Sequence, residues 1–287
     1  MVAAPLSLLL VALAAAPTAA PAPAPASLPM PPPPPPSREA WPLAEVSVGG
    51  SMLSRGATFC AAPLEAWCGK DANLTYSTSL PYLGAAARVM AFPFARGEAV
   101  EWRGLGFEGR YGWGATFVED GTASALATDQ AWSAELLYRQ HVEVLGFRPW
   151  LGARLGAGSR GFSVPDTVEG LQLRRGVGPA LGMDAGLTLL GAALRLELTF
   201  RYAMGARPSA GERELYGDGV SSDGFFASAG LAGAFGAGGD GDGLGWSASL
   251  EQQLFLDTFR GLGTRAPTGA WVMEQYTALT AGLRYRF

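Results

Sequence analysis

The stretch TAGLRYRF, residues 280–287, decides the fold class. Read as an extended chain, it places Leu283, Tyr285 and Phe287 on one face, and Gly282 with two arginines on the other. Amphipathic rings at the end of a strand suit the boundary between lipid and water, because they settle at the level of the lipid headgroups. The stretch therefore predicts a β-strand with one face toward lipid.

Alternation with a period of two recurs along the chain in ten segments. Residues 194–204 show it most clearly, with apolar side chains at even positions and Arg195, Glu197 and Arg201 at odd ones. A helix would scatter those charges around its circumference, because successive residues turn by about 100°. A bulge is expected near Gly104, where the alternation changes phase. We expect strands at about residues 44–54, 81–94, 100–113, 132–139, 151–158, 177–188, 194–204, 225–235, 246–257 and 271–287.

The connections between these segments alternate in length. Those after the second, fourth, sixth and eighth segments are short, and the others are longer and rich in Gly, Pro, Asp, Ser and Thr. Such alternation is typical of an up-and-down meander with tight periplasmic turns and larger external loops. The sequence thus predicts an all-β, transmembrane, antiparallel up-and-down β-barrel of about ten strands. Eight or twelve strands stay open, because the first, second and eighth segments are faint.

The amino-acid composition favours a membrane β-barrel whose outer surface faces lipid over a soluble domain. Charged residues make up 16% of the chain, below the roughly 25% of an average globular protein. The alternative is a soluble barrel or sandwich, which would bury one face and solvate the other without gathering aromatic residues at both strand ends. The net charge of −4 gives no indication of nucleic acid as a partner. Two aromatic belts are expected, an outer one of Trp113, Trp132, Tyr202, Phe225, Phe255 and Trp271, and an inner one of Trp102, Tyr138, Trp246, Tyr285 and Phe287.

The final residues resemble the C-terminal assembly signal of Gram-negative outer-membrane β-barrels. The resemblance rests on Thr280, Gly282, Tyr285 and Phe287. It implies a place in the outer membrane, with both termini periplasmic and the longer loops at the cell surface. It also implies outer-membrane lipid as a partner, and the barrel-assembly machinery with periplasmic chaperones as partners during biogenesis.

The N-terminal region is expected to be exported and then cleaved. Residues 5–16 form a Leu/Ala-rich run that is too short to span a bilayer as a helix, and Ala24-Pro25-Ala26 is a plausible cleavage site. A signal peptide normally begins with positively charged residues, but no Lys or Arg precedes Arg38, so the position of the true start codon stays open. We expect a signal peptide at 1–26, a Pro-rich periplasmic linker at 27–43 that is extended and stiff, and the barrel at 44–287.

The inward face of the expected strands collects charges of both signs. Acids and bases can pair across neighbouring strands, and a barrel of this size is little wider than its own side chains. A plugged or very narrow lumen is therefore expected. The lumen charges are Glu108, Arg110, Glu135, Arg139, Arg154, Asp184, Arg195, Glu197, Arg201 and Glu251.

Cys60 and Cys68 are the only two cysteines, and both fall in the first external loop. In an exported protein the expected pairing is a disulfide between them. Metal binding is the weaker alternative, because no histidine lies near the two thiols. Nothing else in the sequence indicates a metal or a cofactor, since the GxGxxG pattern at Gly104 lies within an alternating strand rather than in a βαβ unit.

His141 is the only histidine, which bears directly on catalysis. Enzymes of this architecture need an Asp–His or a Ser–His pair at the external rim. His141 is expected at the periplasmic end of its strand, and Ser133 at the opposite end of the same strand. We therefore expect a non-enzymatic barrel whose external loops serve surface contact or envelope integrity. The alternatives are a narrow channel for small solutes or ions and, more remotely, a rim-located enzyme acting on lipid or peptide.

Overall fold

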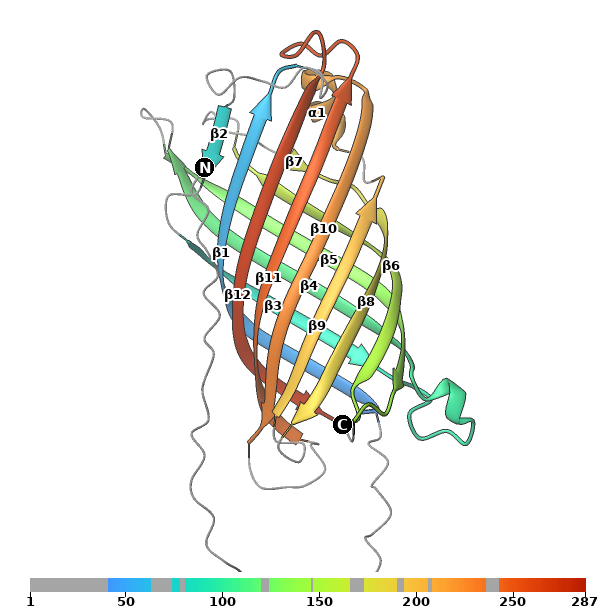
Figure 1. Ribbon diagram of the computed structural model, residues 1–287. Helices are drawn as coiled ribbons and strands as arrows, with labels where there is room; N and C mark the ends of the chain where they lie inside the picture. The colour runs from blue at the N-terminus through green and yellow to red at the C-terminus, as the bar shows by residue number, and fades with distance from the viewer. Residues whose placement is uncertain are drawn as a thin grey trace, which may run out of the picture. The chain divides into compact units, whose positions relative to one another are not determined.

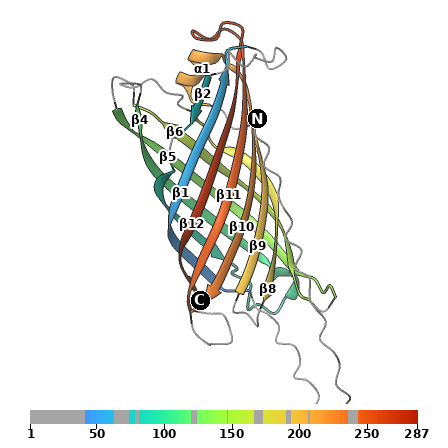
Figure 2. The same ribbon diagram turned by 60° about the vertical axis from the view of Figure 1, so that its left-hand side comes forward.

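The protein is described by a computed structural model for residues 41–62, 74–77, 81–119, 124–145, 147–165, 173–189, 194–205, 208–235 and 243–287. Within these residues the chain forms one closed β-barrel (Figures 1 and 2). The expected signal peptide, residues 1–26, and most of the expected linker, 27–43, lie outside the described residues.

Ten antiparallel strands form the wall, each paired with the next. The two remaining strands are short: β2 (Leu74–Ser77) pairs with β1, and β7 (Leu173–Arg174) pairs with β6. The wall strands are β1 (Ala44–Cys60), β3 (Tyr82–Ala91), β4 (Leu105–Glu119), β5 (Ser124–His141), β6 (Trp150–Ser163), β8 (Gly178–Leu189), β9 (Leu194–Met204), β10 (Gly219–Ala234), β11 (Gly243–Arg260) and β12 (Ala270–Arg286).

The last strand closes the barrel against the first. Their pairing runs from Glu45 opposite Arg286 to Cys60 opposite Trp271. Beyond it, the backbone N–H of Phe287 donates to the carbonyl of Ala44 at 2.9 Å. The seam leaves no unpaired strand edge in the wall, and the predicted fold class is confirmed.

The two ends of the barrel are built differently. The end where β1 begins and β12 finishes is called here the terminal end, and the opposite end is called the loop end. The loop end carries helix α1 (Ala210–Tyr216), while the connection at the terminal end between β3 and β4 contains a 3-10 turn, η2 (Val100–Trp102) (Figure 1). None of the helices in the described residues is long and apolar enough to cross a membrane.

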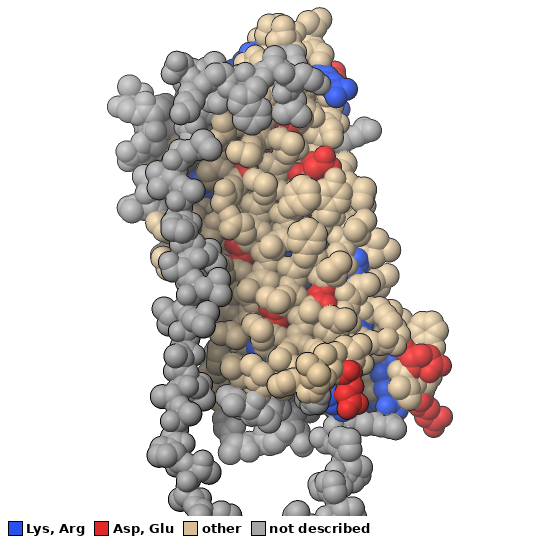
Figure 3. All heavy atoms as spheres, in the orientation of Figure 1, with Lys and Arg blue, Asp and Glu red and all other residues tan. Residues whose placement is uncertain are grey.

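Side chains alternate between the outside and the inside of the wall. The outward ones are apolar and exposed, for example Leu83 at 73%, Phe117 at 72% and Met183 at 64%. The inward ones include buried charges such as Glu108 and Asp184. Figure 3 shows one face, on which most of the wall consists of residues other than Lys, Arg, Asp and Glu. The exterior is thus the apolar side, the reverse of a soluble barrel.

Several strands are longer than expected, which changes the connections. The strands β4 and β5 extend to Glu119 and Ser124, so the expected long loop between them is reduced to residues 120–123. In contrast, the expected short turn after β3 occupies residues 92–104. The strict alternation of short and long connections was therefore wrong in this part of the barrel.

The prediction of a β-bulge at Gly104 was also wrong. Val100 and Trp102 do not continue the alternation of the following strand because they are not part of it. They lie in η2, and β4 begins only at Leu105. Gly104 itself lies so close to β5 that an added Cβ would stand 1.7 Å from the carbonyl oxygen of Arg139. This close approach explains the glycine.

The aromatic belts are only partly present. Trp113, Trp132 and Phe225 are exposed by 41–45%, as expected for an outward belt. Phe255, in contrast, faces the lumen and is only 4% exposed, so its assignment to the outer belt was wrong. Trp271 keeps the outward phase of Met273, but it is only 2% exposed because it packs beside Cys60 and Leu256.

Candidate functional site

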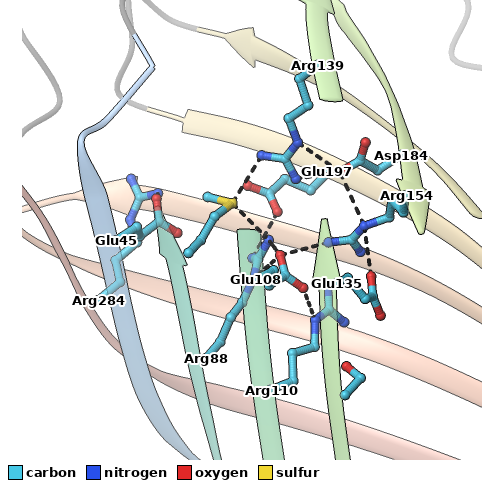
Figure 4. A network of polar contacts seen from close by, with 12 residues as sticks. Glu45, Arg88, Glu108, Arg110, Glu135, Arg139, Arg154, Asp184, Glu197 and Arg284 are labelled. Atoms are coloured by element: carbon cyan, nitrogen blue, oxygen red, sulfur yellow. Dashed lines mark hydrogen bonds and ion pairs between the residues drawn. The ribbon is translucent and has the colours of Figure 1, made fainter. Parts of the chain in front are cut away.

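The lumen holds a network of ion pairs in the half nearer the terminal end (Figure 4). Arg154 Nη2 lies 2.8 Å from Glu108 Oε2, and its Nε lies 3.1 Å from Glu135 Oε2. Arg139 Nη2 donates to Asp184 Oδ2 at 2.5 Å. These five side chains are at most 2% exposed, so the centre of the network is dry.

Some of these pairs cross the lumen instead of following the wall. Arg88 on β3 donates to Glu197 on β9 at 3.1 Å. Four wall strands separate β3 from β9 in either direction around the ring, namely β4, β5, β6 and β8 one way and β1, β12, β11 and β10 the other. The pair therefore spans the full width of the barrel. Arg195 on β9 likewise reaches Glu45 on β1, at 2.9 Å.

A second network fills the half nearer the loop end. Glu274 on β12 accepts hydrogen bonds from Arg55 Nε at 2.5 Å, from Arg175 Nη1 at 2.5 Å and from Tyr276 Oη at 2.8 Å. Arg175 also pairs with Asp257 on β11. Arg175 directly follows β7 in the connection between β6 and β8. Its ion pairs with Asp257 and Glu274 therefore tie this connection to β11 and β12.

Aromatic side chains close both mouths beyond the networks. At the terminal end, Trp41 stacks on His141 at 4.5 Å and on Phe92 at 5.2 Å between ring centroids. The guanidinium of Arg139 lies 4.1 Å from the ring centroid of Trp150. At the loop end, Tyr216 of α1 packs against Phe59 and Phe259 at 5.0 and 5.4 Å.

The connections at the loop end are tied together through α1. Ser209 and Glu212 form a capping box, in which Glu212 Oε2 accepts from the backbone N–H of Ser209 at 2.8 Å. Glu212 also accepts a hydrogen bond from the backbone N–H of Arg174. Burial raises the pKa of the Glu212 carboxyl to about 7, against the opposing effect of these backbone hydrogen bonds. The side chain of Glu212 is only 3% exposed, although it lies in a connection between strands.

A cavity of about 200 Å³ lies in the lumen between the two networks. Its boundary includes Arg88, Arg110 and Arg201 from the network nearer the terminal end. Arg160 and Arg175 border it from the network nearer the loop end. The lumen is thus closed at two levels and open between them.

All ten predicted lumen charges face inward. Six of them lie on β4, β5, β6 and β8, and the other four, Arg195, Glu197, Arg201 and Glu251, lie on β9 and β11 and belong to the same network. For example, Arg201 Nη1 lies 2.6 Å from Glu135 Oε1. Sequence reasoning missed most of the network nearer the loop end. The missed residues are Arg55, Asp129, Arg160 and Arg175.

The four residues of the predicted assembly signal lie on both faces of β12. Thr280 faces inward and its hydroxyl lies 2.8 Å from that of Ser51, and Gly282 pairs with Gly49 and Ser247. Tyr285 and Phe287 face outward with their rings 4.7 Å apart. This arrangement agrees with the expected period-two pattern, while recognition by an assembly machinery stays a prediction.

The predicted disulfide involves one described residue. Cys60 is the last residue of β1 rather than part of a loop, and it is fully buried beside Trp271. Cys68 lies outside the described residues. The pairing stays a prediction. No group of three or more His, Cys, Asp or Glu among the described residues could hold a metal ion.

The candidate catalytic residues are not brought together. His141 is the last residue of β5 and stacks on Trp41. Ser133 was expected at the opposite end of the same strand, but it lies in the middle of β5 because that strand begins at Ser124. Ser133 faces the lumen and accepts a hydrogen bond from Arg201 at 3.2 Å. An eight-residue separation along one strand keeps the two side chains far beyond hydrogen-bond distance.

No protein-family model matches this chain, and no curated protein matches its sequence. Among solved structures it is similar to the outer membrane protease OmpT from Escherichia coli, with 10% identity, a TM-score of 0.48, and coverage of 85% of this chain and 96% of that one. It is also similar to Neisserial surface protein A, with 11% identity, a TM-score of 0.31 and coverage of 85% and 97%. The translocator domain of autotransporter NalP from Neisseria meningitidis gives 12% identity, a TM-score of 0.34 and coverage of 88% and 90%. Identity and TM-score are too low for any of the three to assign an activity to this chain.

Proposed function

We propose that this protein is a non-conducting, non-enzymatic barrel of the outer membrane that presents a braced surface to the environment. The apolar exterior supports its place in lipid. Large apolar side chains point outward from every wall strand, as with Leu155 on β6 and Leu250 on β11, which are exposed by 62% and 52%. Water would make such a surface costly, whereas the hydrocarbon of a bilayer would solvate it.

One observation carries the proposal that the barrel does not conduct. The Arg88–Glu197 pair joins strands on opposite sides of the ring, so its side chains occupy the centre of the lumen. Beside this pair, Arg154 contacts Glu108 and Glu135, and these three side chains are only 1–2% exposed. A conducting pore needs a continuous aqueous path, which ten-stranded barrels rarely have because side chains fill the interior.

The loop end supports a role in surface contact. Three connections are bonded to one another through backbone groups: Ser209 N–H donates to Arg174 at 2.9 Å, and Arg265 N–H donates to Leu215 at 2.9 Å. A surface braced in this way has little conformational entropy to lose when a partner binds. We propose that it faces the outside of the cell and serves contact with the surroundings or envelope integrity. The proposed partners are outer-membrane lipid and, during biogenesis, the assembly machinery and chaperones.

Planar-bilayer recording tests the proposal. The refolded full chain is expected to give no steady ohmic conductance. The double variant Arg88→Ala with Glu197→Ala should stay closed, because the network nearer the loop end still fills the lumen. Adding Arg175→Ala and Glu274→Ala to it should give measurable conductance, because cross-lumen pairs are then removed from both networks. Adding Glu143→Ala and Arg148→Ala to the same double variant is the matched control, since these changes also remove one acid and one base, but from exposed positions. Stable channels in the unaltered protein would refute the proposal.

The second candidate is a narrow channel for small solutes or ions, which the cavity of about 200 Å³ favours. A channel would need both networks to open. The same recordings decide between the candidates, because voltage-dependent openings of the unaltered protein would support the channel.

A further inference from the structure

The connection between β3 and β4 forms a small folded element at the terminal end. It spans residues 92–104, and Figure 1 shows it projecting sideways from the wall instead of continuing the line of the strands. Hydrogen bonds within the connection hold it together. The backbone N–H of Gly97 donates to the carbonyl oxygen of Phe94 at 2.9 Å, and Arg103 Nε donates to the carbonyl oxygen of Gly97 at 2.8 Å. The turn at the start of the connection is thus tied to the segment that follows η2.

The apolar side chains of this element fall into two groups. Phe92 and Ala95 are 0% and 4% exposed, because they pack in an apolar cluster with residues of β3 and β5. Phe94, Val100 and Trp102, in contrast, are exposed by 48%, 61% and 54%. Packing within the chain already uses the first group, so the second group is available for contact outside the chain. Water is a poor solvent for three such side chains on one short connection.

The element leaves the wall at the level of the inner aromatic belt. η2 ends at Trp102, and Leu105, the first residue of β4, pairs with Tyr138 on β5. Tyr138 faces outward with 37% exposure, and an outward ring of this kind marks the boundary between hydrocarbon and headgroups. An element that projects sideways at this level lies along the membrane surface, so its exposed apolar side chains meet lipid.

The charges of the element balance each other. Arg96 and Arg103 are matched in number by Glu98 and Glu101, and all of them except the partly buried Arg103 are exposed. Figure 3 shows acidic and basic side chains together at the lower right, where the element projects. An element with no net charge gains little from anionic lipid, so its apolar side chains must supply the binding. Zwitterionic phospholipids, whose headgroups also carry no net charge, suit it best.

We propose that residues 92–104 form an anchor that binds zwitterionic phospholipid in the leaflet at the terminal end. Phe94, Val100 and Trp102 insert at the depth of the lipid carbonyls, and the four charged side chains stay among headgroups and water. Tryptophan suits that depth, because its ring is apolar and its N–H finds a polar partner. The anchor rests on the proposed place of the barrel in a bilayer, and it names one lipid contact of that barrel.

Quenching by brominated lipid tests the anchor. The full chain is refolded into vesicles of phosphatidylcholine that carries bromine on the acyl chains close to the carbonyls. The contribution of Trp102 to the emission is the difference between the unaltered chain and Trp102→Phe. Most of that contribution should be lost in the brominated vesicles, while acrylamide in the water should quench it much less than in the unfolded chain. Trp150→Phe is the control, because Trp150 is 2% exposed beside the guanidinium of Arg139 and should keep its emission.

Matched double variants separate the apolar side chains from the charges. Phe94→Ser with Val100→Ser should reduce the quenching of Trp102 by the brominated lipid, because two of the three inserted side chains are lost. Both positions are exposed, so the barrel itself should still fold. Glu98→Ser with Glu101→Ser changes the same number of residues in the same connection and should leave the quenching unchanged. Mixing anionic phosphatidylglycerol into the vesicles should also leave it unchanged.

A Trp102 that escapes the brominated lipid but is quenched by acrylamide would overturn the anchor, since its apolar side chains would then lie in water and await a protein partner. Equal loss in the two double variants would also overturn it, as would quenching that requires phosphatidylglycerol, because charges would then hold the element at the membrane.

Trp113 separates these results from a failure of the proposed function. It points outward from β4 with 41% exposure, so brominated lipid should quench it whenever the barrel spans the bilayer, with or without the anchor. A quenched Trp113 beside an unquenched Trp102 would overturn the anchor alone. If neither residue is quenched, the barrel is not in lipid and the proposed function fails with the anchor.

Discussion

Leu198→Arg is the sharpest perturbation of the apolar wall. Leu198 lies in the middle of β9, points outward with 49% exposure, and faces Ala185 on β8 and Ala229 on β10. Neither alanine can pair with a guanidinium, and the strand centre lies farthest from both interfaces. An arginine on the lipid face at the bilayer midplane costs about 2–4 kcal/mol. At about 1.4 kcal/mol per tenfold, this corresponds to a roughly 30- to 700-fold shift of the folding equilibrium.

Urea unfolding in phospholipid vesicles measures this cost. Leu194→Arg is the matched control, because Leu194 is the first residue of the same strand and lies on the same face. Near an interface the same substitution should cost only about 0–1 kcal/mol. Thr199→Arg, on the inward face, should be milder than Leu198→Arg because Thr199 lies opposite Asp184. Equal costs at positions 194 and 198, or a negligible cost at 198, would mean that Leu198 does not face the middle of the bilayer.

Three further predictions concern the lumen, the loop end and the seam. Glu274→Gln should destabilise the barrel by about 3–5 kcal/mol in urea unfolding, because it leaves two buried arginines short of a counter-charge. Glu214→Gln, at an exposed position, should be nearly neutral. Equal effects of the two substitutions would mean that the ion pairs of Glu274 do not stabilise the fold. Because burial raises the pKa of Glu212 to about 7 from 4.5, its contribution is fully present below about pH 4.5 and is lost as pH rises through 7. Hydrogen exchange at residues 209–217, corrected for intrinsic rates, should therefore be faster at pH 8 than at pH 5, and Glu212→Gln should remove the difference; a pH difference that persists in that variant would argue against it. Removing Phe287 should slow closure of the barrel, because its backbone hydrogen bonds to Leu43 and Ala44 are lost. If the folded band appears on gels at an unchanged rate, these hydrogen bonds do not contribute to closure.

The alternation of side chains was enough to predict the wall. Where it was unbroken, as in residues 194–204, the expected and observed strands coincide. Lumen charges such as Glu135 and Arg139 followed from the same period, because inward and outward positions are fixed once the strand is placed.

The network nearer the loop end was missed because the expected strands stopped too early. Arg55 lies one residue beyond the expected end of β1, and Asp129 precedes the expected start of β5, although both keep the inward phase. Extending the alternation through these residues would have found them. Arg175 has no such signal, since it follows a two-residue strand and is placed by tertiary contacts with Asp257 and Glu274.

The pairing of charges across the lumen could not be predicted from the sequence. Alternation places Arg88 and Glu197 inside the barrel, but it does not say that β3 and β9 lie opposite each other. That relation depends on the number of strands and on their register, both of which are set by the whole ring. The inward position of Phe255 could have been predicted, because it shares the phase of Glu251 within the expected strand 246–257. The burial of Trp271 has no such signal, since the residue keeps the outward phase and is covered by contacts beside Cys60.

The most direct test of the central claim, a closed barrel that spans lipid, is refolding into phospholipid vesicles followed by electrophoresis with and without boiling. We expect the protein to stay with the vesicles and the unboiled sample to migrate as a more compact band than the boiled one, with a β-rich far-UV spectrum. A protein that remains in solution and migrates identically in both lanes would contradict it.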